Sequence, residues 1–333
     1  MSTKPIKTTE FSAHLRGKGI DLSNQKILIT NYTGSEQEQD LAEPANCKGF
    51  GRIRNFKLYR NDNWMLNPLP IAPVSKALGL PVSDRIRAQV FQNSICNWRC
   101  WYCFVDFELL SGNPKHASFL SCDEMLDLYL DQNDVPKVID LTGGQPDLTP
   151  EWVPWMMECL KRRGLEDKVF LWSDDNLSND YFWRYLSKEQ IDLVANYKMY
   201  ARVCCFKGID EPSFALNTKA EPALFDNQFE LFSRFHQLGL DLYGYITLTA
   251  STQTDFASAV PKFLDRIQKI HENLPLRIIP LEITEFKPMV DRIGEEQRDA
   301  MEGQYLAMNC WQTELEKRFT PEMRALAITE VKI

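Results

Sequence analysis

The sequence lacks any long apolar run. None of its segments approaches the roughly 18 consecutive apolar residues that a membrane-spanning helix requires, so no membrane partner is expected. The stretch after Met1, through Gly19, is polar and mildly basic and has no apolar centre typical of a signal peptide. We therefore expect the chain to work in the reducing environment of the cytoplasm.

Two further absences narrow the chemistry. There is no phosphate-binding P-loop, and the Gly143-Gly144 pair does not form a dinucleotide fingerprint. Basic residues are outnumbered, with 38 Lys and Arg against 46 Asp and Glu and a formal net charge of −8, which argues against a nucleic-acid partner. Four histidines are present, and none has a spacing typical of a metal site: His14, His116, His236 and His271.

The length and composition are those of an ordinary globular protein. A chain of 333 residues with 44% hydrophobic and 25% charged residues suits one large domain with an appendage or two modest domains. Nine cysteines are an odd number, in a large chain without an export signal, so we do not expect a disulfide framework.

Short β-rich runs alternate with helical patterns from about Arg87 onward, which predicts βα units and a parallel sheet. Six strands are expected near residues 87–93, 137–142, 168–174, 199–206, 240–249 and 276–284. The helices are expected near residues 121–131, 150–163, 179–187, 221–238, 255–273 and 295–318. Six repeats predict an α/β fold with a partial (β/α)6 barrel, because a complete eight-unit barrel would need more chain.

The first 82 residues lack this rhythm and contain one expected strand at residues 26–30. We therefore predict an N-terminal extension over 1–82, a barrel core over 83–290 and a C-terminal helical segment over 291–333. The extension is expected to cover the mouth of the barrel and to narrow access to it.

Three cysteines follow the first predicted strand in a C-x3-C-x2-C run: Cys96, Cys100 and Cys103. Cysteine thiolates are the usual ligands of iron–sulfur clusters, and three of them would leave a fourth iron open for a small chelating molecule. A structural zinc site and three unrelated thiols are the alternatives. Zinc requires a fourth ligand, and the nearest candidates, His116 and Cys122, lie beyond a stretch that contains proline and glycine.

This run, with Tyr102 just before the last cysteine, resembles the cluster motif of the radical S-adenosylmethionine (radical SAM) superfamily. The resemblance covers about 200 residues, from the first strand to about Pro288. It implies a [4Fe–4S] cluster on Cys96, Cys100 and Cys103, and S-adenosylmethionine bound at the open iron. It also implies that the backbone of Tyr102 contacts the adenine.

A second part of the resemblance follows the second predicted strand. Gly143-Gly144-Gln145-Pro146 resembles the "GGEP" segment whose backbone binds the amino group of the methionine moiety in that superfamily. Two glycines let a backbone approach a ligand closely. Gln145 stands where the family usually has glutamate. Both segments fall at the carboxyl ends of parallel strands, where barrel enzymes keep their active sites.

Two later strand ends supply further candidates. Ser173, Asp175 and Asn176 end the third strand, where related enzymes direct polar groups toward the ribose or methionine, although a helix cap is the alternative. Lys207 matches a lysine that meets the methionine carboxylate in glycyl-radical-activating enzymes, in which an aspartate stands at the position of Cys205. Residues two apart in a strand share a face, so we expect Cys205 and Lys207 in the lumen, with Cys205 a candidate catalytic hydrogen-atom donor.

The resemblance implies that a reduced cluster cleaves S-adenosylmethionine to methionine and a 5′-deoxyadenosyl radical, which takes a hydrogen atom from a substrate. We expect a small-molecule or peptide substrate and a one-electron donor such as a flavodoxin or ferredoxin. Two other functions stay open. The Lys207 segment suggests an activase that installs a glycyl radical on a partner enzyme, and the cysteines alone would suit a non-catalytic Fe–S or zinc module.

Overall fold

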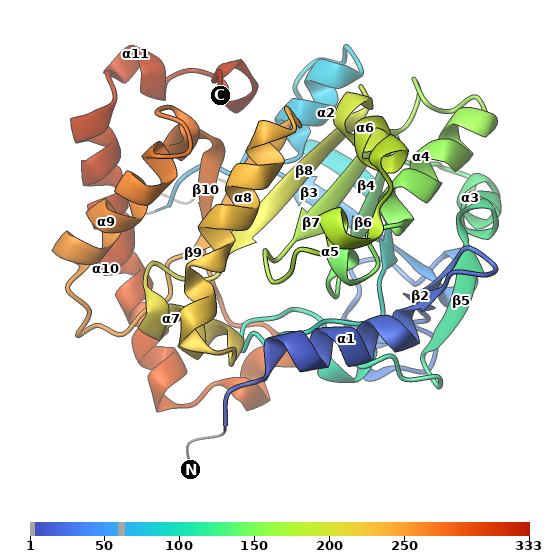
Figure 1. The fold of residues 1–333 in the computed structure, drawn as a ribbon, viewed down its shortest axis with the longest axis horizontal. Helices are drawn as coiled ribbons and strands as arrows, with labels where there is room; N and C mark the ends of the chain where they lie inside the picture. Colours follow the sequence, from blue (N-terminus) through green and yellow to red (C-terminus); the bar gives the residue numbers. More distant parts are fainter. Residues whose placement is uncertain (1–3, 59–63) are drawn as a thin grey trace.

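The computed structural model describes residues 4–58 and 64–333. Its centre is a seven-stranded sheet, ordered β10-β9-β8-β7-β6-β4-β3, that curls into an open half-barrel (Figure 1). The strands are β3 (Gly51–Lys57), β4 (Arg85–Gln92), β6 (Val138–Thr142), β7 (Phe170–Asp175), β8 (Tyr200–Phe206), β9 (Leu242–Thr247) and β10 (Ile278–Leu281). Six of them pair in parallel, which confirms the predicted α/β partial barrel and its strands. The seventh strand, β3, was not predicted and pairs antiparallel with β4.

Helices cover the outer face of this sheet (Figure 1). They are α3 (Cys122–Leu130), α4 (Trp152–Arg162), α5 (Tyr181–Tyr185), α6 (Lys188–Asn196), α7 (Glu211–Thr218), α8 (Asn227–Gln237) and α9 (Phe256–Gln268). The helix predicted over 179–187 ends early at Tyr185. Ser187 then begins α6, because its hydroxyl accepts the backbone N–H of Gln190 while the Gln190 side chain accepts that of Ser187.

Strand alternation separates two apolar clusters. Leu242 and Ile246 of β9 pack under the helices with the largest cluster, whereas Tyr243 and Tyr245 face the lumen side with a second cluster. The second cluster closes one end of the barrel. It contains these lumen-facing residues from the strands, together with residues of α2 (Ile71–Ala77) and the C-terminal segment: Phe56, Val138, Phe170, Val203, Ile71, Val74 and Ile328. The carboxyl ends of the strands lie at the other end of the barrel.

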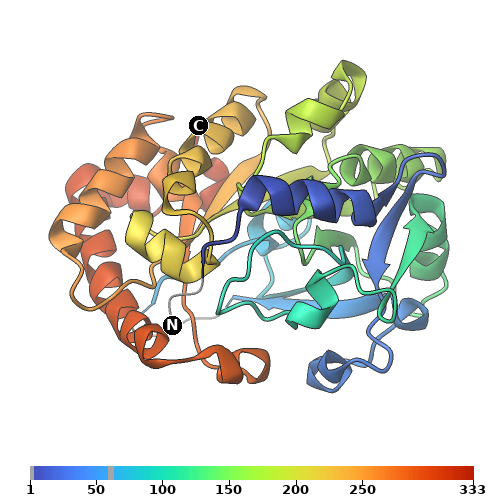
Figure 2. The same cartoon turned by 60° about the horizontal axis from the view of Figure 1, so that its bottom comes forward.

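The N-terminal segment contributes to several parts of the molecule. The helix α1 (Thr8–Gly19) lies beside the coil that follows β4, and Leu15 packs with Ile95 of that coil (Figures 1 and 2). The predicted strand at 26–30 is present as β2 (Lys26–Thr30) in a small sheet with β1 (Ile20–Asp21) and β5 (Ala117–Ser121). Residues 1–3 and 59–63 of the predicted extension lie outside the described residues.

The long helix α10 (Glu295–Arg318) has the predicted bounds and packs against α9 (Figure 1). Trp311 is fully buried in this contact, with its ring centre 6.2 Å from that of Phe263. Within the described residues, no helix is long and apolar enough to cross a membrane. A last short helix, α11 (Pro321–Arg324), precedes the C-terminus.

Candidate functional site

The cysteine loop leaves the carboxyl end of β4 and is held by its own backbone. The N–H of Cys96 donates to the carbonyl of Leu110 at 3.0 Å, and the N–H of Cys103 donates to the carbonyl of Cys100 at 3.0 Å. Arg99 adds a side-chain contact, because its guanidinium donates to the carbonyl of Cys96 at 2.6 Å. These contacts therefore hold the backbone of the loop in a compact turn.

The three thiols are free and influence one another. Burial raises the pKa of Cys100 to about 12, with further increments from the neighbouring Cys96 and Cys103. In the described part of the chain, no three His, Cys, Asp or Glu side chains stand close enough to hold a metal ion as they are. The donor chemistry nevertheless fits an iron–sulfur cluster, because three soft thiols gather on one loop with the cationic Lys207 and Arg292 beside them.

The segment that follows β10 covers this loop. Trp101 and Tyr102 pack with Ile283 and Met289, and all four side chains are buried. Arg292 donates to two carbonyl oxygens of the loop segment, at 2.7 Å and 3.2 Å. The cover excludes water from the side of the loop that faces β9 and β10.

Lys207 and Cys205 both reach the space beside the cysteine loop, as the strand alternation predicted. The Nζ of Lys207 lies 5.8 Å from the ring centre of Tyr102, whose hydroxyl is hydrogen bonded to Thr247 at 3.0 Å. Burial opposes the charge of Lys207, yet the Cys205 and Cys100 thiols and Tyr102 raise its pKa above the ordinary value. Lys207 therefore lies beside the Cys100 and Cys205 thiols and the Tyr102 ring.

The glycine segment packs directly on the start of the cysteine loop. Gly143 and Gly144 have φ angles of 69° and 59°, which glycine adopts without strain. A Cβ atom at Gly144 would lie 2.3 Å from the carbonyl oxygen of Ile95, so any larger residue would push the two segments apart. The N–H of Gln145 donates to that same carbonyl at 2.7 Å, just before Pro146 begins a short 3-10 turn.

Three of the predicted cofactor residues meet in one hydrogen-bond network. The Gln145 amide donates to Asp175 at 2.7 Å and accepts the N–H of Asn176 at 3.0 Å. The side chain of Asn176 donates in turn to Asn97 of the cysteine loop at 3.1 Å, while its own Oδ1 is buried without a partner. Ser173 lies apart, with its hydroxyl 2.7 Å from that of Tyr200.

This network rests on a buried arginine that the sequence analysis did not single out. Arg202 binds both oxygens of Asp147, at 2.7 Å and 3.1 Å, and lies 3.5 Å from Asp175. Burial and the charge of Asp147 raise the pKa of Asp175 to about 7, while Arg202 opposes the increase. The sequence does contain a feature that could have indicated Arg202: it is the one charged residue in the otherwise apolar run of β8. Its partner Asp147, 55 residues earlier, lies in no such run and could not have been selected from the sequence.

Two lumen carboxylates were also missed. Asp140 of β6 is fully buried, and its Oδ2 lies 3.4 Å from the guanidinium of Arg54 on β3. Burial and the charge of Asp174 raise the pKa of Asp140 to about 8. One oxygen of each aspartate is buried without a hydrogen-bond partner. An aspartate in the middle of an apolar strand was visible in the sequence, but β3, which carries its partner, was not predicted.

The Asp140→Asn substitution tests this environment through pH. Because the pKa is about 8 in the folded state and 3.8 in the unfolded reference, folding takes up a proton between these values, and wild-type stability falls as pH rises through that window. Each unit of elevation corresponds to about 1.4 kcal/mol. We expect the melting temperature of the variant, relative to wild type, to be higher at pH 8 than at pH 5. A difference that stays constant or shrinks with pH would contradict the assignment.

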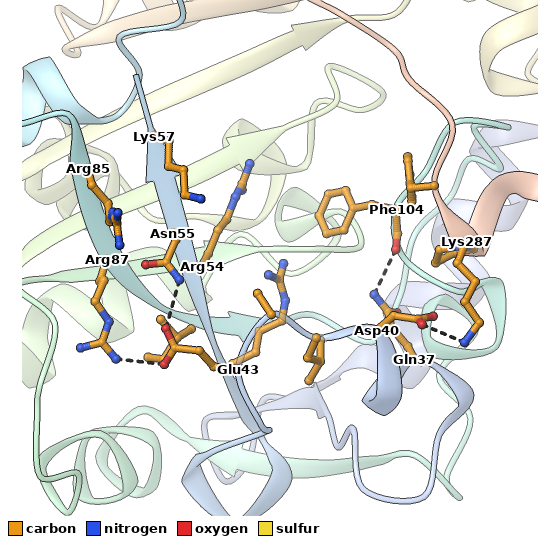
Figure 3. Close-up of a pocket in the computed structure, with 16 residues that line it drawn as sticks. Gln37, Asp40, Glu43, Arg54, Asn55, Lys57, Arg85, Arg87, Phe104 and Lys287 are labelled. Atoms are coloured by element: carbon orange, nitrogen blue, oxygen red, sulfur yellow. Dashed lines mark hydrogen bonds and ion pairs between the residues drawn. The ribbon is translucent and has the colours of Figure 1, made fainter. Parts of the chain in front are cut away.

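A cavity of about 910 Å³ opens along β3, beside Arg54 and the end of the cysteine loop (Figure 3). Its inner wall includes Arg52 and Arg54, whose guanidinium groups lie 5.3 Å and 5.9 Å from the ring centre of Phe104. Phe104 directly follows the third cysteine. The cavity thus extends from the cysteine loop toward the edge of the sheet.

No protein-family model matches the chain, and no curated protein matches it in sequence. Among solved structures, SuiB of Streptococcus suis bound to precursor peptide SuiA is 15% identical over 54% of this chain and 36% of that chain, with a TM-score of 0.38. SuiB bound to S-adenosylmethionine has 16% identity over 54% and 37% of the two chains and a TM-score of 0.37. A structure of anSMEcpe with bound AdoMet and Cp18Cys peptide has 13% identity over 58% and 49%, and a TM-score of 0.39. The chain spans half the length of these proteins or less.

Proposed function

We propose that the protein is a radical SAM enzyme. The observation that carries the proposal is the junction of the two segments at neighbouring strand ends. The loop with Cys96, Cys100 and Cys103 leaves β4, and the glycine segment leaves β6 and is hydrogen bonded to the start of that loop. Carboxyl ends of parallel barrel strands are the usual place for active sites.

In this proposal the three cysteine thiolates hold a [4Fe–4S] cluster, and S-adenosylmethionine binds beside it. Bound there and reduced, the cluster would supply the electron for cleavage of S-adenosylmethionine to methionine and a 5′-deoxyadenosyl radical. The backbone of Tyr102 contacts the adenine, and the backbone at Gly143 and Gly144 binds the methionine amino group. The cationic Lys207 binds the carboxylate.

The remaining polar groups orient the cofactor. The free Oδ1 of Asn176 and the nearby Asp175 are available to ribose or methionine groups, and Gln145 and Pro146 fix their position. Ser173 is connected to this network indirectly, because its hydroxyl is hydrogen bonded to Tyr200, which accepts from Arg202. Cys205 is the candidate catalytic hydrogen-atom donor, and burial, as the largest effect, raises its thiol pKa to about 11, which keeps the S–H bond intact at neutral pH.

The proposed substrate is a small molecule or a peptide, with a flavodoxin or ferredoxin as the electron donor in the cytoplasm. Within residues 1–82, the described segment Glu36–Asp40 acts as a cover of the core at 83–290, while β3 extends the core sheet. Residues 291–333 support the core from the side of α9. In support, Gln37 donates to the carbonyl of Phe104 at 3.0 Å, and Asp40 pairs with Lys287 at 2.8 Å, so the extension crosses beside the cysteine loop. This cover favours a narrow substrate over the large partner of a glycyl-radical activase.

Anaerobic reconstitution tests the proposal. The purified chain is loaded with iron and sulfide, its bound metals are quantified, and 5′-deoxyadenosine is measured after addition of dithionite and S-adenosylmethionine. We expect about four iron atoms per chain and product formation. Zinc bound in place of iron, or a complete cluster that binds no S-adenosylmethionine, would contradict the proposal and favour a non-catalytic module.

A further inference from the structure

The cavity along β3 is strongly basic although the chain is acidic. Six cationic side chains line it: Arg52, Arg54, Lys57, Arg85, Arg87 and Lys287. Among the described residues, two carboxylates line the cavity with them, Asp40 and Glu43, and these pair with Lys287 and Arg87. Arg54 is also paired with the buried Asp140, and Arg87 with Asp134, so Arg52, Lys57 and Arg85 are the lining cations that no ion pair of the described residues neutralises. Figure 3 shows Arg54, Lys57, Arg85 and Arg87 projecting from two adjacent strands, with Phe104 and Lys287 on the opposite side. The surplus of positive charge in this groove calls for an anionic ligand.

Two features of the groove have no structural explanation of their own. Lys57 and Arg85 stand directly opposite each other in the β3–β4 register, an arrangement of like charges that destabilises a sheet. Within the described chain, neither takes part in an ion pair. Arg52 is only 8% exposed, and its Nη2 is buried without a hydrogen-bond partner. A buried guanidinium with a free nitrogen is costly unless a ligand completes its hydrogen bonds.

The shape of the groove matches an extended chain. β3 is the last strand of the sheet, so its outer edge has no strand partner among the described residues. The lining follows this edge from Arg52 to Lys57, five residue steps and therefore about 16 Å. An extended peptide can pair with a free strand edge through its backbone while its side chains reach pockets on either side.

We propose that this groove binds an extended acidic peptide segment. Its carboxylates contact the cations from Arg52 to Lys57 and Arg85, and its backbone pairs with the outer edge of β3. The inner end of the groove is formed by Phe104, next to Cys103, so a bound segment leads toward the cysteine loop. The identification of this segment as the substrate rests on the proposed function. The binding of an acidic peptide to the groove is independent of it.

Fluorescence anisotropy tests the binding with three labelled hexapeptide amides: Ala-(Glu)4-Ala, Ala-(Gln)4-Ala and Ala-(Lys)4-Ala. We expect the Glu peptide to bind the full-length protein best, by at least about tenfold over the Gln peptide at low salt. The Lys57→Glu/Arg85→Glu double variant changes two exposed side chains and should weaken Glu-peptide binding by at least about tenfold. The matched control, Lys161→Glu/Lys168→Glu, makes the same charge change at exposed positions on and after α4 and should bind within about twofold of wild type.

Three results would overturn the proposal. The first is equal binding of the Glu and Gln peptides, and the second is equal weakening by the two double variants. The third is competition by free glutamate as effective as that by the unlabelled Glu peptide, which would make the groove a small-carboxylate site. A Glu peptide with alternate N-methylated amides tests the backbone pairing: binding should be lost, and unchanged binding would refute the strand addition.

The experiment separates this proposal from the enzymatic one. Cys100→Ala should bind the Glu peptide like wild type while failing to produce 5′-deoxyadenosine. A wild-type protein that cleaves S-adenosylmethionine but does not bind the peptide would refute the groove alone. A protein that binds the peptide but never assembles a cluster would refute the radical chemistry alone.

Discussion

Replacing Cys100 by alanine is expected to remove nearly all 5′-deoxyadenosine formation from the reconstituted protein. Cys100 is the middle cysteine of the loop, and the thiols of Cys96, Cys103 and Cys205 lie close enough to shift its pKa. A cluster with two protein ligands instead of three is poorly held, so we expect bound iron to fall below about one atom per chain and product to fall roughly 100-fold or more. Iron analysis and product chromatography measure the two effects separately.

The matched control is Cys310→Ala. Cys310 is a free, partly buried cysteine on α10, outside the loop, and its removal changes the thiol count by the same amount. Iron content and product should stay within about twofold of wild type, because the proposed function assigns the cluster to the loop thiols alone. Full activity in Cys100→Ala, or an equal loss in both variants, would show that the loop does not hold the cluster.

The Arg202→Met substitution is expected to have the largest effect on stability. Arg202 is completely buried between Phe182 and Phe235, with ring centres at 5.1 Å and 4.3 Å, and it binds Asp147 and lies near Asp175. Methionine fills much of the space but leaves two buried carboxylates without their cation. Breaking a buried pair in this way costs about 3–5 kcal/mol, which chemical denaturation can measure.

The pH dependence of the Arg202→Met deficit distinguishes lost charge from lost packing. Without Arg202, the pKa of the buried Asp175 rises further above its ordinary value, so this carboxylate takes up a proton on folding. The deficit should therefore be smaller at pH 5 than at pH 8. Arg184→Met, at an exposed position on α5, should cost less than about 0.5 kcal/mol at either pH. A deficit for Arg202→Met that does not depend on pH would mean that packing alone explains it.

The parallel core could be predicted from sequence because its strands are short apolar runs separated by helical patterns. The elements that were missed have weak patterns of their own. α1 is largely polar, so its fold depends on contacts such as that of Leu15 with the loop after β4. In β3 the alternating positions Arg52 and Arg54 carry charge where a half-buried strand usually carries apolar residues. The free edge and the lumen carboxylates that accommodate these charges exist only in the folded protein.

The candidate site was likewise predicted only in part. The cysteine and glycine segments are local motifs, so they could be found from residues that are close in sequence, and the structure brings them together. Arg202 and Asp147 are far apart in the chain, as are Arg54 and Asp140, and each pair is defined by strand order. Ser173, Asp175 and Asn176 were selected as one polar strand end. Alternation instead turns Ser173 toward Tyr200, whereas Asp174, which was not selected, faces Thr142.

The hydrogen bond between Gln145 and Asp175 limits how this sequence can evolve. A glutamine can donate to the aspartate and also accept the N–H of Asn176, whereas a glutamate at position 145 would place two buried carboxylates in direct contact. A glutamate at position 145 would therefore require a proton held between the two groups or a compensating change at position 175. The shared hydrogen bond thus makes the side chain at position 175 part of the constraint on position 145.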